Sequence, residues 1–208
     1  MVLTGEILMA RKPLRRQKTI GFQQVLLQDS SVNSTQWMTL PSTYCETLDP
    51  SQLLERYLRH IRLFTLTLIR PSYVSAHELE FRLLNTRYSL ISFTGPHFAT
   101  TEGVHMVSLS ICGGLLVQRD NCRRGGLSFI TKKIRNGLKV IVQLSDYCPL
   151  LLGSARPARW RKVLYRLTQA YIHRIVTIRF LSRLYRDLEG NTATVRVVRR
   201  RTRHGEDI

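Results

Sequence analysis

The spacing of apolar and polar positions changes along this chain, and each change predicts a different kind of element. Residues 19–28 form a largely apolar run that ends in a polar segment at 29–34, which predicts one strand followed by a loop. Between 53 and 64 the apolar residues recur at helical spacing, and Asp49 before them can cap the free amides of a first turn. The first third of the chain is therefore predicted to be a strand and then a helix.

Apolar and polar residues alternate through the middle of the chain, as they do in strands with one buried face and one face in water. The alternating segments number about five and cover residues 79–83, 88–93, 104–111, 127–130 and 138–144. Asn136 and Gly137 separate the last two segments, and an Asn-Gly pair between apolar runs is a strong hairpin signal. This part of the chain is therefore predicted to be an antiparallel meander.

Helical spacing returns from 157 to 188, where the apolar residues form one broad stripe that ends before Gly190. The predicted fold class is thus α+β, an antiparallel β-meander packed on a long C-terminal helix. This order of elements resembles the START-like helix-grip superfamily over residues 19–188. The resemblance implies a cavity between sheet and helix for a small apolar or amphipathic ligand, and it implies no particular reaction.

Composition and charge divide the chain into three parts. Residues 1–18 are expected to be a flexible basic arm, 19–190 a single α+β domain, and 191–208 a basic tail. A chain of 208 residues that is 43% hydrophobic can form one core without metals or disulfides. No apolar stretch has the length of a membrane span or a signal-peptide core, so we expect a cytoplasmic location.

The net charge of +18 predicts that any macromolecular partner is negatively charged. Nucleic acid and an anionic membrane surface both fit that description, and an Arg-rich composition without a partner is the alternative. The cysteines Cys45, Cys112, Cys122 and Cys148 lack metal-binding spacing. We expect buried free thiols, with a Cys112–Cys122 disulfide across a hairpin as the alternative.

Basic residues gather around the predicted hairpin of the meander. The candidate anion-binding residues are Arg123, Arg124, Lys132, Lys133 and Arg135. Guanidinium groups beside flexible glycines can bind phosphate oxygens in pairs, whereas the alternative is a hydrated surface with no partner. The polar side of the last helix also carries arginines, Arg183 among them, with no acid before Asp187. That pattern also favours an anion-facing surface, since exposed helices usually intersperse acids.

A second set of polar residues falls where the helix-grip resemblance implies a cavity. Tyr165, Gln169 and His173 step by four and so share one helix face, and Tyr147 ends the meander. These four residues are the candidate ligand pocket, where they would orient a ligand within an apolar wall. The alternative is that they are ordinary surface residues.

Catalytic motifs are absent from the sequence. It contains no H-E-x-x-H, no G-x-S-x-G and no phosphate-binding loop, so no cofactor, metal or catalytic residue is predicted. Three functions stay open. The first is a non-enzymatic protein that binds a small ligand and has a cationic, anion-facing surface. The second is a sequence-independent nucleic-acid-binding protein that uses the basic surface and both tails. The third is a cyclase- or hydrolase-type enzyme with Tyr147 or His173 as the acid–base group.

Overall fold

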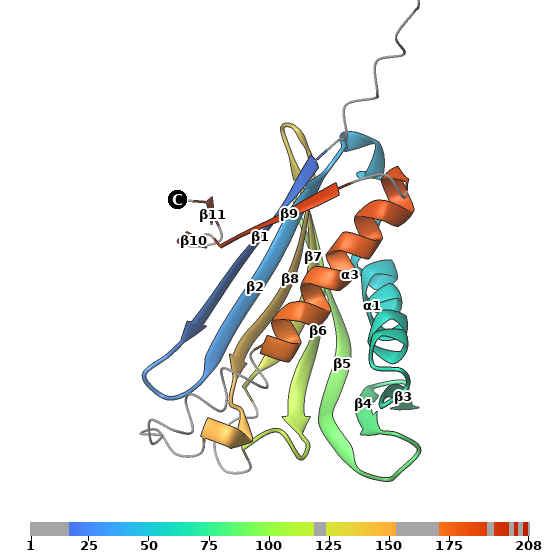
Figure 1. Cartoon of the computed structure of the whole chain (residues 1–208), viewed down its shortest axis with the longest axis vertical. Coiled ribbons are helices and arrows are strands. Elements are labelled where there is room, and N and C mark those ends of the chain that lie inside the picture. Colours follow the sequence, from blue (N-terminus) through green and yellow to red (C-terminus); the bar gives the residue numbers. More distant parts are fainter. Residues whose placement is uncertain are drawn as a thin grey trace, which may run out of the picture.

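Nine strands of this chain pair into one sheet that carries two helices on the same face (Figure 1). The structure is a computed structural model, and it describes residues 17–118, 124–152, 171–190, 194–199, 202–203 and 206–207. The strands are β1 (Gln17–Leu26), β2 (Val32–Leu40), β3 (Ile69–Ser75), β4 (Glu78–Leu83), β5 (Ser89–Thr101), β6 (Val104–Gly113), β7 (Gly126–Ile134), β8 (Gly137–Tyr147) and β9 (Thr194–Arg199). They pair in the order β3-β4-β5-β6-β7-β8-β2-β1-β9. The β1–β9 pair is parallel and the other pairs are antiparallel.

Two helices, α1 (Pro50–Phe64) and α3 (Tyr171–Glu189), cover the sheet. Helix α1 contacts β3, β6 and β7, α3 contacts β1 and β2, and the helices contact each other. Asp49 accepts a hydrogen bond from the Gln52 amide at 3.0 Å, which confirms the predicted cap of α1. Short 3-10 turns η1 (Ser42–Tyr44) and η2 (Leu150–Leu152) and the small pair β10 (Thr202–Arg203) and β11 (Glu206–Asp207) complete the described elements.

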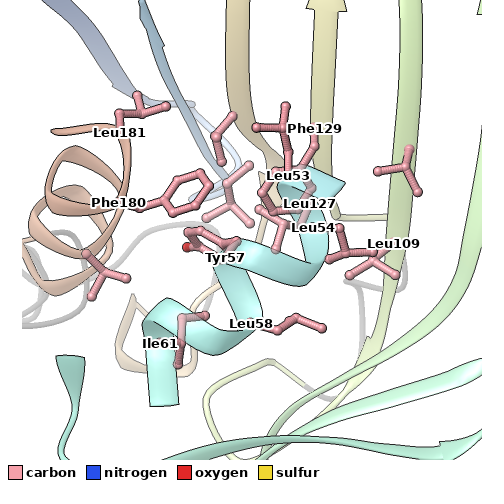
Figure 2. Packing of buried hydrophobic residues seen from close by; sticks show 14 of the residues in the cluster. Leu53, Leu54, Tyr57, Leu58, Ile61, Leu109, Leu127, Phe129, Phe180 and Leu181 are labelled. Carbon is pink, nitrogen blue, oxygen red and sulfur yellow. The ribbon is translucent and has the colours of Figure 1, made fainter. Parts of the chain in front are cut away.

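One hydrophobic core joins both helices to the sheet (Figure 2). Tyr57 of α1 lies at its centre and packs edge-to-face on Phe129 of β7 and on Phe180 of α3, with ring centroids 5.1 Å apart in both pairs. Its hydroxyl lies 3.4 Å from the Thr177 hydroxyl, so the buried tyrosine keeps a polar partner. The shared core fixes α1 and α3 side by side, and this arrangement creates the groove described below.

The structure confirms an α+β fold with a large sheet and a C-terminal helix. Residues 157–170 of the predicted last helix lie outside the described residues. The prediction of a loop at 29–34 is wrong from Val32 onward, because β2 begins there and forms a central strand between β1 and β8. The sequence did not predict β2 because several of its residues are polar. Ser34 and Gln36 are fully buried, and the Gln36 amide donates to the Ser34 hydroxyl at 2.7 Å.

Both ends of the described chain extend the sheet beyond the predicted meander. β1 begins at Gln17, within the segment that we expected to be a flexible arm. β9 lies within the expected basic tail and pairs with β1 from Gln17–Thr194 to Phe22–Arg199. Val195 in β9 packs against the core. The arginines of this segment led to the prediction of a tail. Its alternating valines, Val195 and Val197, are enough for an edge strand.

The cysteines differ from the expectation of buried free thiols. Cys45 is half-buried and Cys112 is exposed, and neither forms a disulfide, which excludes the Cys112–Cys122 alternative. Cys148 is disulfide-bonded. Because disulfides persist mainly in oxidising compartments, Cys148 no longer supports the cytoplasmic expectation. Within the described residues, neither helix combines the length and the apolar character that crossing a bilayer requires.

Candidate functional site

The structure describes two of the four predicted pocket residues and places them on different elements. Tyr147, the last residue of β8, is buried and donates its hydroxyl to the Leu116 carbonyl at 2.8 Å. His173 lies in the first turn of the described α3, where its buried Nε2 has no hydrogen-bond partner among the described residues, and burial lowers its pKa to about 4. Tyr165 and Gln169 lie outside the described residues.

β7 separates the predicted anion-binding residues. Arg124 precedes this strand, whereas Lys132, Lys133 and Arg135 are exposed at its far end. An extended chain rises about 3.3 Å per residue, so the nine steps from residue 124 to residue 133 span roughly 30 Å. Arg124 also forms an ion pair with Asp29, and the pKa of Asp29 falls to about 2 through hydrogen bonds from Ser31 and then from Arg124. These cations therefore do not form one site, and Arg123 lies outside the described residues.

A different group of cations meets at a groove between α1 and α3. The groove has a volume of about 380 Å³ and is lined by Arg56, Arg59, His60, Leu63, Phe180, Arg183, Leu184, Asp187 and Leu188. The residues from α1 share one face because they are three or four positions apart, and those from α3 do so for the same reason. Packing of the two helices on the sheet brings these faces together, and we call the result the arginine groove.

Positive charge dominates the arginine groove. Arg56, Arg59 and Arg183 are exposed guanidinium groups, against which stands the single carboxylate of Asp187. Arg183 Nε lies 3.9 Å from Asp187 Oδ2, the outer limit for an ion pair, and both side chains are about half exposed. Such a pair contributes little stability and leaves the guanidinium free to bind another anion. The groove thus presents a net excess of two positive charges.

His60 gives the arginine groove a buried polar group that makes no well-formed hydrogen bond within the described residues, although the Val176 backbone carbonyl acts on its pKa as an acceptor would. The residue is 7% exposed, and neither ring nitrogen has a hydrogen-bond partner of acceptable geometry. Its ring stacks on Phe64 at 5.6 Å and lies 5.8 Å from the Phe180 ring. Buried polar groups are normally paired, so an unpaired histidine in a groove suggests a partner that binds there.

Burial and the neighbouring Arg183 both favour the neutral form of His60. Burial lowers the pKa of His60 below its ordinary value, the Arg183 guanidinium lowers it further, and the Val176 carbonyl acts in the opposite direction. A neutral imidazole offers one donor and one acceptor. It can therefore donate to an oxyanion, or accept from a hydroxyl, that the arginines hold.

Apolar side chains complete the arginine groove. Phe180 and Leu184 are almost fully buried, whereas Leu63 is 49% exposed. Ligand sites commonly combine an apolar lining with a few polar groups, and volumes of roughly 300–1,000 Å³ are usual. The groove can therefore hold a small molecule that has both an anionic group and an apolar portion.

Sequence reasoning recognised half of the arginine groove. The acid-free polar side of the last helix, including Arg183, indicated an anion-facing surface. The set Arg56, Arg59 and His60 was overlooked, although its spacing places it on one helix face. The pairing of the two faces has no signal in the sequence, because α1 and α3 lie more than a hundred residues apart.

In the part of the chain that the structure describes, no three His, Cys, Asp or Glu side chains come together to hold a metal ion.

Comparison with known proteins adds no assignment: no protein-family model, no curated protein and no solved structure matches this chain. The function must therefore be argued from the arginine groove itself.

Proposed function

We propose that this protein binds a small anionic ligand with an apolar portion in the arginine groove. The observation that carries this proposal is the meeting of three arginines around the buried His60, whose ring has no side-chain hydrogen-bond partner in the described residues. Guanidinium groups bind carboxylate or phosphate through paired hydrogen bonds. The apolar part of the ligand would lie on Leu63, Phe180 and Leu184.

The resemblance to the START-like helix-grip superfamily is part of the same proposal. The order β2, α1, β3 to β8 and α3 supports it, with β1 and β9 as additions at one edge. In the described region the space between the sheet and the two helices is filled by the core side chains. The proposed site therefore lies between the helices at the surface, not in the interior pocket that the resemblance implies.

Octyl phosphate is a suitable probe, with inorganic phosphate and octanol as head-only and tail-only comparisons. Isothermal titration at low salt should show that octyl phosphate binds more tightly than either comparison. The double substitution Arg59→Gln and Arg183→Gln should weaken it at least about tenfold, since each arginine contributes charge-assisted hydrogen bonds. Lys133→Gln removes an exposed cation at the β7–β8 hairpin and is the matched control.

The result that contradicts the proposal is equal affinity of the double variant and the Lys133→Gln control. That outcome would assign binding to general positive charge. Absence of any octyl phosphate binding would contradict it as well. The melting temperature should not fall in the double variant, because both arginines are exposed and removing them reduces repulsion between like charges.

Octyl phosphate loses charge as the pH falls through its second pKa of about 6, so octyl sulfate, whose charge is constant, is the probe for pH dependence. Its affinity should rise as the pH falls. A bound anion offsets the effect of Arg56, Arg59 and Arg183 on His60 and so raises the pKa of its imidazole, with Asp187 as the other charged group of the groove. Binding then takes up a proton and is favoured by acid. In His60→Gln this pH dependence should disappear while binding persists.

Nucleic-acid binding is the second candidate. The exposed Lys132, Lys133 and Arg135 at the β7–β8 hairpin favour it, together with the overall charge of +18. Contacts of this kind would be to the phosphate backbone and would weaken steeply with salt. Substitution of these three residues by glutamine should then reduce affinity for a random oligonucleotide, and unchanged affinity would refute a role for the hairpin.

A further inference from the structure

An exposed apolar surface lies at the end of α1, where the α1–β3 loop meets the β4–β5 turn. We call it the apolar tip, and it comprises Leu63, Phe64, Leu66, Leu68, Leu84 and Tyr88. Leu66 is 87% exposed and Tyr88 is 63% exposed, and the other four are each more than 40% exposed. Figure 1 shows the C-terminal end of α1 beside β3 and β4, whose flanking loops carry Leu66, Leu68, Leu84 and Tyr88.

Backbone hydrogen bonds hold the apolar tip together. The Leu84 amide donates to the Leu68 carbonyl at 2.7 Å, which joins the β4–β5 turn to the α1–β3 loop. Within the loop, the Thr67 amide donates to the Arg62 carbonyl at 2.7 Å. The Thr65 hydroxyl donates to the Ile61 carbonyl at 2.8 Å and accepts from the Ile69 amide at 3.0 Å. The leucines are thus presented on a defined surface.

Two leucines of the apolar tip occupy a backbone conformation that disfavours them. Leu66 and Leu84 both have φ of 51°, in the left-handed region that glycine and asparagine tolerate best. Asparagine at either position would relieve this strain and also remove exposed apolar surface. Strained residues gather at ligand and switch sites, where function requires a particular side chain. The two leucines therefore point to an apolar partner.

Positive charge surrounds the apolar tip. Arg62, Arg70, Arg82 and Arg87 lie within the two segments 62–70 and 82–88, which contain no aspartate or glutamate. Glu80 neutralises Arg82 at 2.7 Å, and Arg70 donates to the neutral Asn85 at 3.2 Å. Within the described residues, three of the four arginines therefore form no ion pair beside the exposed leucines.

We propose that the apolar tip docks on an anionic lipid bilayer. Leu66, Leu84 and Tyr88 would enter the boundary between headgroups and acyl chains, and the arginines would contact the lipid phosphates. Charge decides between this partner and a second copy of the chain. A symmetric dimer through the tip would set the same arginines against each other, whereas an anionic surface attracts them.

This inference is independent of the ligand proposed for the arginine groove and goes beyond it. The two surfaces adjoin, since Leu63 lines the groove and also belongs to the apolar tip. A bilayer-docked protein would therefore hold the groove close to the membrane surface, where anionic amphiphiles are concentrated.

The test is flotation of the full chain with vesicles of phosphatidylcholine alone and with vesicles in which about a third of the lipid is phosphatidylglycerol. The protein should float with the anionic vesicles and not with the neutral ones. The variant Leu66→Asn with Leu84→Asn should lower the partition coefficient about tenfold or more, because two exposed leucines no longer leave water. Its melting temperature should equal or exceed that of the wild type, since asparagine suits both backbone positions.

Phe98→Thr is the matched control, because it removes an apolar side chain that is 67% exposed on β5, outside both tip segments. It should bind anionic vesicles like the wild type. Equal binding by the Leu66→Asn, Leu84→Asn variant would overturn the proposal and assign binding to general charge. Sedimentation that shows a wild-type dimer, a monomeric double variant and no vesicle binding would overturn it in favour of a second copy. The double variant should still bind octyl phosphate, so failure of this inference is distinguishable from failure of the groove proposal.

Discussion

Acid should destabilise this protein through His173. Burial lowers the pKa of this histidine to about 4 in the folded state, against an ordinary value of 6.5, although the residue as a whole keeps some exposed surface. As the pH falls below 6.5, His173 binds a proton in the unfolded chain but stays neutral in the folded chain until the pH approaches 4. The free energy of unfolding therefore decreases. Each pH unit between the folded-state and unfolded-state pKa values lowers the free energy of unfolding by about 1.4 kcal/mol. Between pH 6.5 and pH 5 the loss from His173 should therefore reach about 2 kcal/mol as an upper limit.

Urea unfolding at pH 7 and pH 5 measures this loss. The variant His173→Gln cannot titrate, so its stability should change by about 2 kcal/mol less than that of the wild type over this range. His60, whose pKa burial and Arg183 also lower, contributes in the same direction and is separated by His60→Gln. Asp29 has a folded-state pKa near 2 and remains ionised throughout. Identical pH dependence of the wild type and His173→Gln would refute the assignment of a buried, neutral His173.

Three further predictions concern the fold. Gly137→Ala should destabilise by about 2 kcal/mol or more in chemical denaturation, since φ is 139° and the new Cβ would lie 2.0 Å from a carbonyl oxygen of β2. Gly103→Ala, whose new Cβ would meet only the Lys133 Cβ at 3.9 Å, should cost less, and equal losses would contradict this account. Leu181→Ala should cost about 2–5 kcal/mol because the side chain is fully buried, whereas Ile172→Ala, 52% exposed, should be nearly neutral in the same assay. Asp49→Ala should lower the unfolding free energy by about 1 kcal/mol through loss of the α1 cap, and an unchanged midpoint in urea would show that the cap contributes nothing.

Local patterns in the sequence were sufficient for several elements of this fold. Asp49 marked the start of α1, and Asn136-Gly137 marked the β7–β8 hairpin, whose strands end at Ile134 and begin at Gly137. Alternation predicted the strands of the meander, because one face of each packs against the core. These signals are readable because cap, turn and period depend on residues a few positions apart.

Long-range packing decided what the sequence could not show. β2 was unrecognised, since Ser34 and Gln36 are polar residues that only a central position in the sheet buries. The anion-binding set was divided because β7 is fully extended between Arg124 and Lys133. Contacts of this kind join residues far apart in the chain, so the local spacing of apolar and polar residues does not predict them.

The sequence by itself determined the α+β class, helix α1, the described part of the C-terminal helix and the alternating middle. The tertiary structure alone decided which cations meet. Arg59 and Arg183 lie on the polar faces of separate helices, and nothing in the sequence indicates that they meet. They share a groove with the unpaired His60 because the apolar faces of α1 and α3 bury themselves on one sheet, and that burial, not any property of the polar residues, sets their distance.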